Sequence, residues 1–377
     1  MVTECDFLVV GAGIAGASAG YELAARGAVV VLERESQPGY HTTGRSAAFY
    51  APAYGNATIR ALTLGAKSFF DAPPPGFCDH PLLTPRGAVF VGRADQRAAL
   101  ETLYRETKAA LDEVRLLDAA TTCDLVPALR PEYAAGGVSD PVATDIDVHG
   151  LHQGFLKGLK GRGGIVVCDA EVRGLERTGG RWVADTPAGR FAAPTLIDAA
   201  GAWCDVVAEM AGVEPVGLVP KRRTVLTFDG PAGVDCAAWP LTVDVDEQFY
   251  FKPESGRLLA SPADETPMPP CDVQPDDLDI AIAIDRLQRA TTLAVPRIVS
   301  KWAGLRSFVA DKTPTVGYDD KVEGFFWLAG QGGYGIQTAP SMGRVACALA
   351  CGEDIPPDLA DHGVTAAALA PARLRGG

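Results

Sequence analysis

The chain opens with a short apolar run, which is followed by a glycine-rich turn and an alanine-rich segment. Residues 6–10 and 28–32 are almost entirely apolar. Runs of this length without alternation are typical of parallel strands that are buried on both faces. The segment from Ile14 to Arg26 has the composition of a helix, and Gly27 ends it. The pattern therefore predicts a βαβ unit at the N-terminus.

Helical and extended periodicities alternate along the rest of the chain. They predict helices over residues 58–70, 97–119, 145–161 and 277–293, and from the last glycine-rich loop to about residue 351. They predict strands over residues 82–84, 88–91, 164–168, 170–175, 181–184, 194–198, 223–228, 241–243, 248–252, 301–308 and 325–329. We expect the tail after Ala366 to be mobile.

Changes in composition and in the pattern of predicted helices and strands divide the chain into two interleaved domains. Three prolines and Gly76 mark the first boundary. We predict an α/β fold, with a Rossmann-like nucleotide-binding domain and a second α/β domain built on a mixed or antiparallel sheet. The first domain comprises residues 1–72, 140–215 and 300–377, and the second comprises residues 73–139 and 216–299.

Composition narrows the class of protein. Of the 377 residues 47% are hydrophobic and 21% are charged, and the net charge is −13. Because a negative chain repels nucleic acid and anionic membranes, we expect neither as a partner. The sequence has no apolar run long enough for a membrane span and no basic start typical of a signal peptide. Its nine cysteines lack the spacing of a disulfide framework, so we expect a cytoplasmic protein.

Two pairs of potential metal ligands have simpler interpretations. Cys347 and Cys351 are four residues apart on a predicted helix, but no other cysteine or histidine lies nearby in the sequence to complete a tetrahedral site. We interpret them as structural thiols rather than ligands. His149 and His152 begin an amphipathic helix that follows Asp147, and we interpret them as surface histidines of a capped helix. We therefore predict no metal site.

The first glycine-rich turn has the spacing of a dinucleotide-binding motif. Gly11 permits a tight turn, Gly13 lets the backbone approach a pyrophosphate, and Gly16 lets the helix pack closely on the strand. The helix start directs free N–H groups at the phosphates. Glu33 ends the second strand, where a carboxylate accepts hydrogen bonds from an adenosine ribose. The unit therefore predicts a dinucleotide site.

A second glycine-rich loop near the C-terminus repeats this chemistry. Residues 330–335 join a predicted strand to a predicted helix. The small residues 199–201 and the hydroxyl-rich segment 39–55 leave room for a flat ligand. One extended ligand, with phosphates at one end and a polar ring at the other, would use both loops. We therefore predict FAD rather than a nicotinamide that comes and goes.

Several strings of residues resemble a known family. Residues 11–16, 41–46, 199–203 and 330–337 look like the D-amino-acid oxidase superfamily of flavoproteins. Within it, the chain resembles the FAD-dependent D-arginine dehydrogenases at residues 37–41, 76–78, 80–83, 220–223, 249–250 and 302–311. The likeness spans nearly the whole chain. It implies noncovalent FAD and a second domain that covers the isoalloxazine ring.

The resemblance assigns roles to the residues at matching positions. The catalytic set would hold the substrate carboxylate with Arg223 and Arg306, cover the site with Tyr54 and Tyr250, and contact the substrate near its amino group with Gly333 and Gln337. The motifs and the resemblance together predict cofactor contacts from Gly11, Gly13, Ile14, Ala15, Gly16, Glu33, Arg34, Thr42, Thr43, Gly44, Arg45, Ser46, Ala47, Val172, Gly201, Trp203, Gly330, Gly332, Tyr334, Gly335, Ile336, Gln337 and Thr338.

The predicted side-chain pocket departs from the arginine-preferring relatives. Those enzymes place an acidic residue at the position of Ala88 and polar residues at the positions of Phe49 and Ala51. An unpaired guanidinium is costly to desolvate, so we expect neutral or apolar substrate side chains. Asp244 is a charged residue that would counter this preference if it reached the substrate. The predicted pocket consists of Phe49, Ala51, Ala88, Leu241, Val243 and Asp244.

These expectations define one reaction and its rivals. The resemblance implies oxidative deamination of a D-amino acid to a 2-oxo acid and ammonia, with hydride transfer from Cα to the flavin N5 atom. The electron acceptor is either oxygen or a quinone-type molecule. The same fold would also suit a secondary amine of the glycine or sarcosine type, or a 2-hydroxy acid. A third alternative is a flavoprotein subunit that transfers electrons without turning over a substrate.

Overall fold

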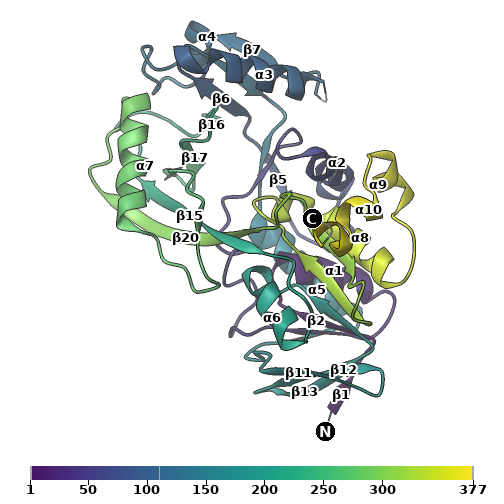
Figure 1. The fold of residues 1–377 in the computed structure, drawn as a ribbon. Coiled ribbons are helices and arrows are strands. Elements are labelled where there is room, and N and C mark those ends of the chain that lie inside the picture. Colours follow the sequence, from purple (N-terminus) through teal and green to yellow (C-terminus); the bar gives the residue numbers. More distant parts are fainter. Residues whose placement is uncertain (1, 110, 376–377) are drawn as a thin grey trace.

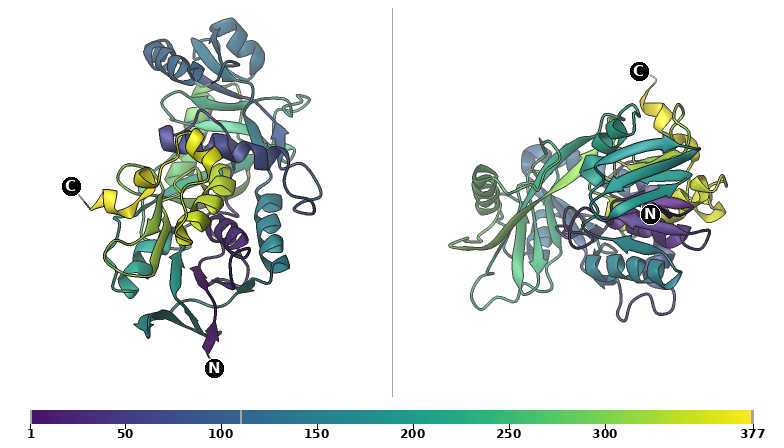
Figure 2. Two further views of the ribbon diagram at one scale, coloured as in Figure 1. Left: turned by 90° about the vertical axis from the view of Figure 1, so that its right-hand side faces the viewer. Right: turned by 90° about the horizontal axis from the view of Figure 1, so that it is seen from below.

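A computed structural model describes residues 2–109 and 111–375. It confirms the predicted α/β class, with helices packed on several sheets (Figures 1 and 2). The sheets lie in two regions, one with six-stranded and four-stranded sheets and the other with a nine-stranded sheet. No helix in the described ranges is long and apolar enough to cross a membrane.

The six-stranded sheet is the centre of the first region. Its strands, in spatial order, are β10 (Ile165–Val167), β3 (Val29–Leu32), β2 (Phe7–Val10), β14 (Thr195–Asp198), β22 (Phe325–Ala329) and β21 (Thr315–Tyr318). All neighbours are parallel except β21 and β22. The N-terminal βαβ unit is confirmed, since α1 (Ile14–Leu23) connects β2 to β3.

The two faces of this sheet are buried by different layers. Side chains such as Val9 and Val31 pack with α1 and α8 (Gly335–Ala350), beside α2 (Ala57–Asp71) and α5 (Val148–Gly161). Their neighbours Leu8 and Val30 face the other way, against Trp182 and α6 (Cys204–Met210). That second layer is the sheet of β1 (Val2–Glu4), β13 (Gly189–Ala193), β12 (Arg181–Thr186) and β11 (Gly174–Thr178). Burial on both faces explains why the strands lack alternation.

The second region is built on a nine-stranded mixed sheet. Its strands are β19 (Thr266–Pro267), β15 (Val219–Phe228), β18 (Arg257–Ser261), β17 (Tyr250–Glu254), β16 (Leu241–Asp244), β6 (Ala88–Gly92), β8 (Gly136–Asp140) and β7 (Arg115–Asp118), with β20 (Ile298–Phe308) beside β15. Within the described part of this sheet, only β6 and β16 pair in parallel. β20 belongs to this sheet, although its sequence was assigned to the nucleotide-binding domain. The domain division itself stays a prediction.

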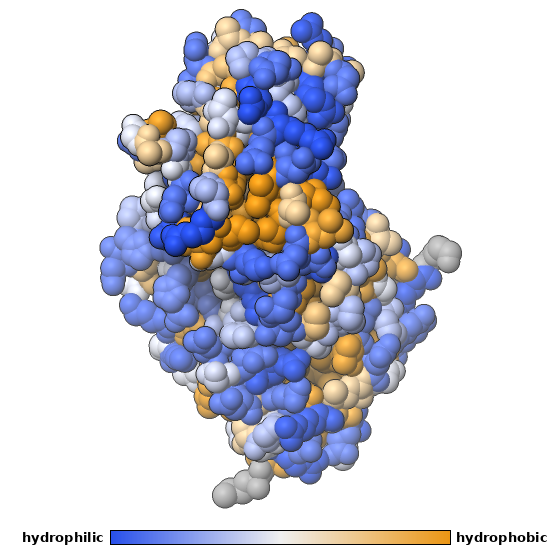
Figure 3. Space-filling view, turned by 90° about the vertical axis from the view of Figure 1, so that its left-hand side faces the viewer, coloured by the Kyte–Doolittle hydropathy of each residue, from blue (hydrophilic) through white to orange (hydrophobic). Residues whose placement is uncertain are grey.

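α4 (Ala119–Leu125) and α7 (Asp277–Ala290) pack on one face of this sheet, and the other face carries α3 (Arg97–Lys108) near β6 and β8 and otherwise looks toward the first region (Figure 1). α7 packs Ile280, Ala283 and Leu287 into the core on its face. The strands β4 (Phe49–Tyr50), β9 (Thr144–Ile146) and β5 (Leu83–Pro85) form a separate three-stranded sheet. The short helices α9 (Pro357–Asp361) and α10 (Ala366–Leu369) follow α8, and a 3-10 helix at Pro371–Leu374 comes after them. Seen from the α7 side, the surface is mostly hydrophilic, with apolar side chains gathered at mid-height (Figure 3).

Some predicted elements have the wrong extent. The helix predicted over residues 145–161 begins at Val148, because the residues before it form β9. The helix predicted over residues 97–119 ends at Lys108, and the chain then forms β7, which pairs with β8. This strand forms because β8 offers it an edge, which no local pattern reveals. The strand predicted over residues 170–175 is displaced, since β11 begins at Gly174. β11 pairs with β12 as an antiparallel hairpin.

The prediction of a mobile tail after Ala366 is wrong for the described residues. The Leu369 side chain is fully buried, and Arg375 forms ion pairs with Asp319 and Asp320. Arg373 donates to Asp311 with an Nε to Oδ2 distance of 2.8 Å. These partners are distant in sequence, so the tail is held by tertiary contacts and not by a pattern of its own.

The expectation of surface histidines at the start of α5 is wrong for His152. This side chain is only 4% exposed, and its Nε2 lies 2.8 Å from the carbonyl oxygen of Ala12. The predicted cap is confirmed, because Asp147 accepts a hydrogen bond from the N–H of Gly150. The nine cysteines are all free, and the described residues contain no group of three metal-binding side chains.

Candidate functional site

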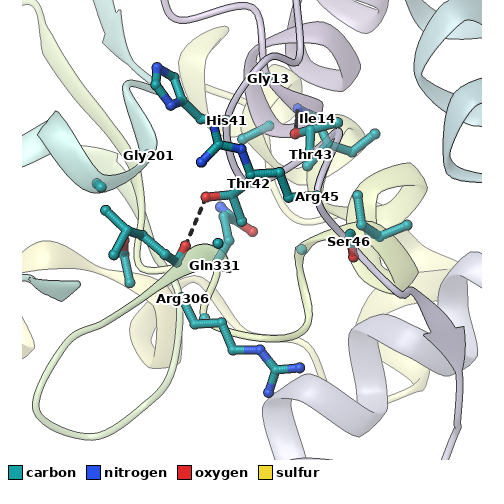
Figure 4. A pocket seen from close by; sticks show the side chains of 18 of the residues that line it. Gly13, Ile14, His41, Thr42, Thr43, Arg45, Ser46, Gly201, Arg306 and Gln331 are labelled. Atoms are coloured by element: carbon teal, nitrogen blue, oxygen red, sulfur yellow. Dashed lines mark hydrogen bonds between the residues drawn. The ribbon is translucent and has the colours of Figure 1, made fainter. Parts of the chain in front are cut away.

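A cavity of about 410 Å³ lies between the two regions. Its lining runs from the carboxyl ends of β2 and β3, past the segment after Glu33, to the inner face of the nine-stranded sheet. Figure 4 shows Gly13 and Arg306 toward opposite ends of the view, with Thr43 and Ser46 between them. The cavity is therefore elongated, with a glycine-lined end and an arginine-lined end.

The first glycine turn forms the wall at one end. Gly11 has a φ of +101°, and a Cβ there would lie 2.5 Å from the carbonyl oxygen of Ala199. A Cβ on Gly16 would lie 1.9 Å from the carbonyl oxygen of Gly11, so close helix packing requires glycine. The N–H groups in the first turn of α1 have no partner four residues earlier in the helix. That of Ile14 is held by Thr43 Oγ1, at 2.9 Å.

Glu33 lines the cavity beside this turn. It is 7% exposed, and its two oxygens accept the backbone N–H groups of Ala12 and Glu35, each at 3.0 Å. Burial raises the pKa of Glu33, and these hydrogen bonds act in the opposite direction. Since a carboxylate has about four acceptor positions, capacity for ligand hydroxyls remains.

The segment after Glu33 crosses between the two regions. Thr42 donates to the carbonyl oxygen of Leu305 at 2.8 Å (Figure 4). Arg45 donates to the carbonyl oxygens of Val273 and Ala303 at 3.0 and 3.2 Å. The guanidinium of Arg45 is therefore largely engaged in fixing this segment against β20 while the residue lines the cavity.

Arg223 and Arg306 line the same end of the cavity. In the antiparallel pair of β15 and β20, Arg223 lies opposite Gly304, two residues from Arg306. Residues in this diagonal relation share a sheet face at about 7–8 Å. Burial, and then the charge of Arg306, lower the pKa of Arg223. Two cations on one face in a poorly hydrated site form a strong anion-binding position.

The other predicted catalytic residues surround this pair. Tyr54 and Tyr250 line the cavity, and the Tyr54 ring packs on that of Tyr334 with centroids 5.1 Å apart. Gln337 is 3% exposed and is fixed by two hydrogen bonds, from the N–H of Ala51 at 3.1 Å and to Thr63 Oγ1 at 3.0 Å. A Cβ on Gly333 would lie 3.0 Å from Arg306 Nη1.

A few predicted site residues do not line the cavity. Gly16 and Gly44 instead fit where a side chain would collide with backbone oxygens. Tyr334 and Thr338 lie in and before the first turn of α8, where the Thr338 hydroxyl donates to the Tyr334 carbonyl oxygen at 2.9 Å. Every other predicted cofactor residue lines the cavity.

Asp244 also lies outside the cavity. It is fully buried on the far side of β16, where it accepts hydrogen bonds from Tyr133 at 2.8 Å and from Gln96. Leu241 and Val243 line the cavity, and strand residues two apart share a face. Asp244 therefore cannot counter the expected preference for neutral side chains.

Three further residues line the side-chain end and were not predicted, namely Phe90, Glu247 and Lys252. Alternation gives a signal for two of them. Phe90 follows Ala88 by two residues on β6, and Lys252 follows Tyr250 by two on β17. Glu247 lies in the turn between β16 and β17, with a φ of +53°, and has no such signal.

Comparisons with known proteins agree with this geometry. The family described as FAD dependent oxidoreductase (DAO) matches residues 6–349. YurR of Bacillus subtilis, an uncharacterized oxidoreductase, is 25% identical over 375 residues, which cover 95% of this chain and 98% of YurR. The glycine oxidase of Geobacillus kaustophilus is 23% identical over 384 residues, which cover 97% and 98%.

Solved structures show the same fold. The crystal structure of that glycine oxidase has a TM-score of 0.82 at 21% identity and covers 97% of this chain and 99% of its own. The L-proline dehydrogenase of P. horikoshii has a TM-score of 0.84 at 17% identity, with 100% and 99% covered.

The lining of the cavity fits FAD. Residues of both glycine loops line the cavity. A Cβ on Gly201, in the turn after β14, would meet no other group within 4 Å, so there is space beside this turn as well. Gln331 lines the same space, and its buried Nε2 has no hydrogen-bond partner among the described residues, as expected near a site where a ligand binds. The residues from Gly11 to Ala15, with Glu33, would hold the adenosine and pyrophosphate, and residues 330–337 the flavin end.

Proposed function

Because the chain belongs to the DAO family of FAD-dependent oxidoreductases, we propose that it deaminates D-amino acids oxidatively, with neutral or apolar side chains preferred over cationic ones. The resemblance of its residues to the D-arginine dehydrogenases supports a D-amino acid as substrate. The observation that carries the proposal is the placement of Arg223 and Arg306 on one sheet face, at the end of the cavity away from the first glycine turn.

The two guanidinium groups would fix the substrate by its carboxylate. A guanidinium binds a carboxylate through two parallel hydrogen bonds, and two such groups fix its orientation as well as its position. Tyr54 and Tyr250 would exclude water above the substrate, and Gln337 is held rigidly for contact with its amino group. FAD, when bound, supplies the acceptor for the hydride that leaves Cα. The resulting imino acid hydrolyses in water to a 2-oxo acid and ammonia.

The walls of the side-chain pocket support the preference for neutral groups. Ala88, Leu241 and Val243 offer it no negative charge, and Asp244 faces away. Among the described residues Glu247 is the one carboxylate that lines this end of the cavity, and its charge acts on Arg306 and Arg223. A cationic substrate side chain would lose its hydration against the apolar walls without gaining an anionic partner from them.

We also propose that FAD is held noncovalently and that the protein is cytoplasmic. No cysteine is among the described residues that line the cavity, and the imidazole of His41 is engaged with Glu35, 2.9 Å away. Free cysteines throughout the chain support a reducing compartment. Oxygen or a quinone-type molecule would reoxidise the flavin.

A secondary amine of the glycine or sarcosine type is the rival substrate, since a glycine oxidase is among the relatives. The test is anaerobic mixing of the holoenzyme with D-leucine, D-methionine, D-phenylalanine, D-arginine, D-lysine, glycine and sarcosine, followed by air. We expect the neutral D-amino acids to bleach the flavin absorbance fastest. Faster bleaching by D-arginine or D-lysine would refute the side-chain preference. Bleaching by glycine or sarcosine alone would refute the D-amino-acid assignment, and no bleaching by any compound would favour an electron-transfer role.

A further inference from the structure

The side-chain end of the cavity contains a buried ammonium group. Lys252 lies on β17 and lines the cavity, and it is only 4% exposed. The register of β16 with β17 pairs Val243 with Tyr250, and continued by two residues it places Leu241 beside Lys252. Leu241 in turn pairs with Ala88 on β6. Lys252 therefore stands in one row with two walls of the predicted pocket.

Two carboxylates hold this ammonium in place. Lys252 Nζ lies 2.6 Å from Asp145 Oδ1 and 2.9 Å from Glu254 Oε2. Asp145 also accepts from Arg86, with an Nε to Oδ2 distance of 2.7 Å. Asp145 lies opposite Phe49 in the pair of β4 and β9, which brings the cluster to the Phe49 wall of the pocket. The cluster has two positive and two negative charges, so it is balanced.

The cavity meets only one member of this cluster. Lys252 lines it, whereas Asp145, Glu254 and Arg86 are absent from the described lining. An ammonium has three N–H donors and no acceptor, and the contacts with described residues engage two of them. Apart from Glu247 in the turn between β16 and β17, the pocket therefore has apolar walls and Lys252 as a hydrogen-bond donor, without an acceptor from this cluster.

We propose that Lys252 is a specificity residue that selects D-amino acids whose side chain ends in a neutral amide, such as D-asparagine and D-glutamine. The inference rests on the proposed function and names the substrate class of the same site. A carbonyl oxygen takes the remaining donor without changing the charge of the cluster. A carboxylate at the end of the substrate side chain would add a third negative charge beside Asp145 and Glu254. An ammonium or guanidinium there would have only donors, which cannot accept the hydrogen bond that Lys252 offers.

The unaltered protein gives the first test. D-asparagine and D-leucine have side chains of nearly the same shape, and apolar walls alone would place D-asparagine tenfold or more behind in kcat/KM. We expect D-asparagine to be used at least as well as D-leucine. A lag of tenfold or more would overturn the inference, and so would D-aspartate or D-glutamate being the best substrate.

Substitution gives the second test. Lys252→Met keeps the length of the side chain and removes its donors, so the ratio of kcat/KM for D-asparagine over D-leucine should fall about tenfold. Lys252→Arg keeps a donor and should retain most of the ratio. Lys301→Met is the matched control, because Lys301 is exposed on β20 and does not line the cavity. An unchanged ratio in Lys252→Met, with D-leucine turnover and FAD content retained, would overturn the inference.

The two proposals fail in distinguishable ways. If no D-amino acid bleaches the flavin, the proposed function fails. If D-leucine bleaches the flavin, D-asparagine reacts more slowly, and the ratio of their kcat/KM values is the same in Lys252→Met, only the proposed role of Lys252 fails. Should Lys252→Met not fold, the comparison in the unaltered protein and the Lys252→Arg variant still decide the question.

Discussion

At the scale of single residues, the position of the Arg306 guanidinium, which we propose holds the substrate carboxylate, depends on the absence of a side chain at Gly333. A Cβ there would lie 3.0 Å from Arg306 Nη1 and 3.1 Å from its Cζ. We expect Gly333→Ala to displace the guanidinium by a few tenths of an ångström and to reduce kcat/KM for D-leucine about tenfold, mainly through KM. Steady-state kinetics of the holoenzyme measure this effect.

Gly161→Ala is the matched control for that variant. Gly161 is the last residue of α5, and a Cβ there would meet no atom of another group within 4 Å. It should leave kcat/KM unchanged and stability equal or slightly higher, because alanine favours a helix. An unaltered KM in Gly333→Ala would show that Arg306 does not hold the substrate as proposed.

The sequence predicted which residues line the cavity better than the direction in which their side chains point. Arg223 and Arg306 follow from the resemblance, and the cavity indeed has both in its lining. Asp244 was grouped with Val243, although adjacent strand residues point to opposite faces. Alternation was also not applied to β17, where Lys252 is two residues from Tyr250 and therefore shares its face, so Lys252 was overlooked. Strict alternation along β16 and β17 would have corrected both.

At the scale of elements, the position of the first glycine turn depends on α5. His152 in this helix donates from Nε2 to the carbonyl oxygen of Ala12, at 2.8 Å. Burial lowers the pKa of His152 below its usual value of 6.5. As the pH falls below that value, His152 therefore takes up a proton in the unfolded chain before it does so in the folded protein. This group then lowers the free energy of unfolding by up to about 1.4 kcal/mol per pH unit.

We therefore expect His152→Gln to weaken the pH dependence of stability. Glutamine keeps an N–H donor at a similar distance and does not titrate. Between pH 7 and pH 5.5, the free energy of unfolding should fall less steeply in the variant than in the unaltered protein, as measured by urea titration. Carboxylates contribute equally to both proteins, so the difference isolates His152. Parallel slopes would contradict this role.

The same scale explains which elements the sequence could predict. The N-terminal βαβ unit follows from local composition, and α7 was predicted within three residues at its C-terminal end. β7 could not be predicted, because it exists only through pairing with β8. The tail was misjudged for a similar reason, since Arg375 finds Asp319 and Asp320 far away in the sequence.

At the scale of the whole molecule, the cavity is where the two regions meet, so its ligand should stabilise the complete fold. Both regions contribute residues to the lining. Gly11 lies in the turn after β2, and Arg223 and Arg306 lie on the nine-stranded sheet. A ligand that binds only the folded state at 100 times its Kd stabilises that state by about 2.7 kcal/mol. For a chain of this size, that corresponds to a rise in Tm of about 3 °C.

Removal and return of FAD measures this contribution together with the mode of attachment. Acid precipitation of the holoenzyme should leave the flavin in the supernatant, because the proposed attachment is noncovalent. Apoprotein prepared by mild dialysis should unfold at a lower temperature by circular dichroism. Added FAD should restore the Tm and riboflavin should not, because in our proposal Glu33 and the first glycine turn would bind the adenosine and pyrophosphate that riboflavin lacks. Flavin that stays in the precipitate would refute noncovalent attachment. Equal stabilisation by riboflavin would refute the assignment of the glycine-lined end to the adenosine and pyrophosphate.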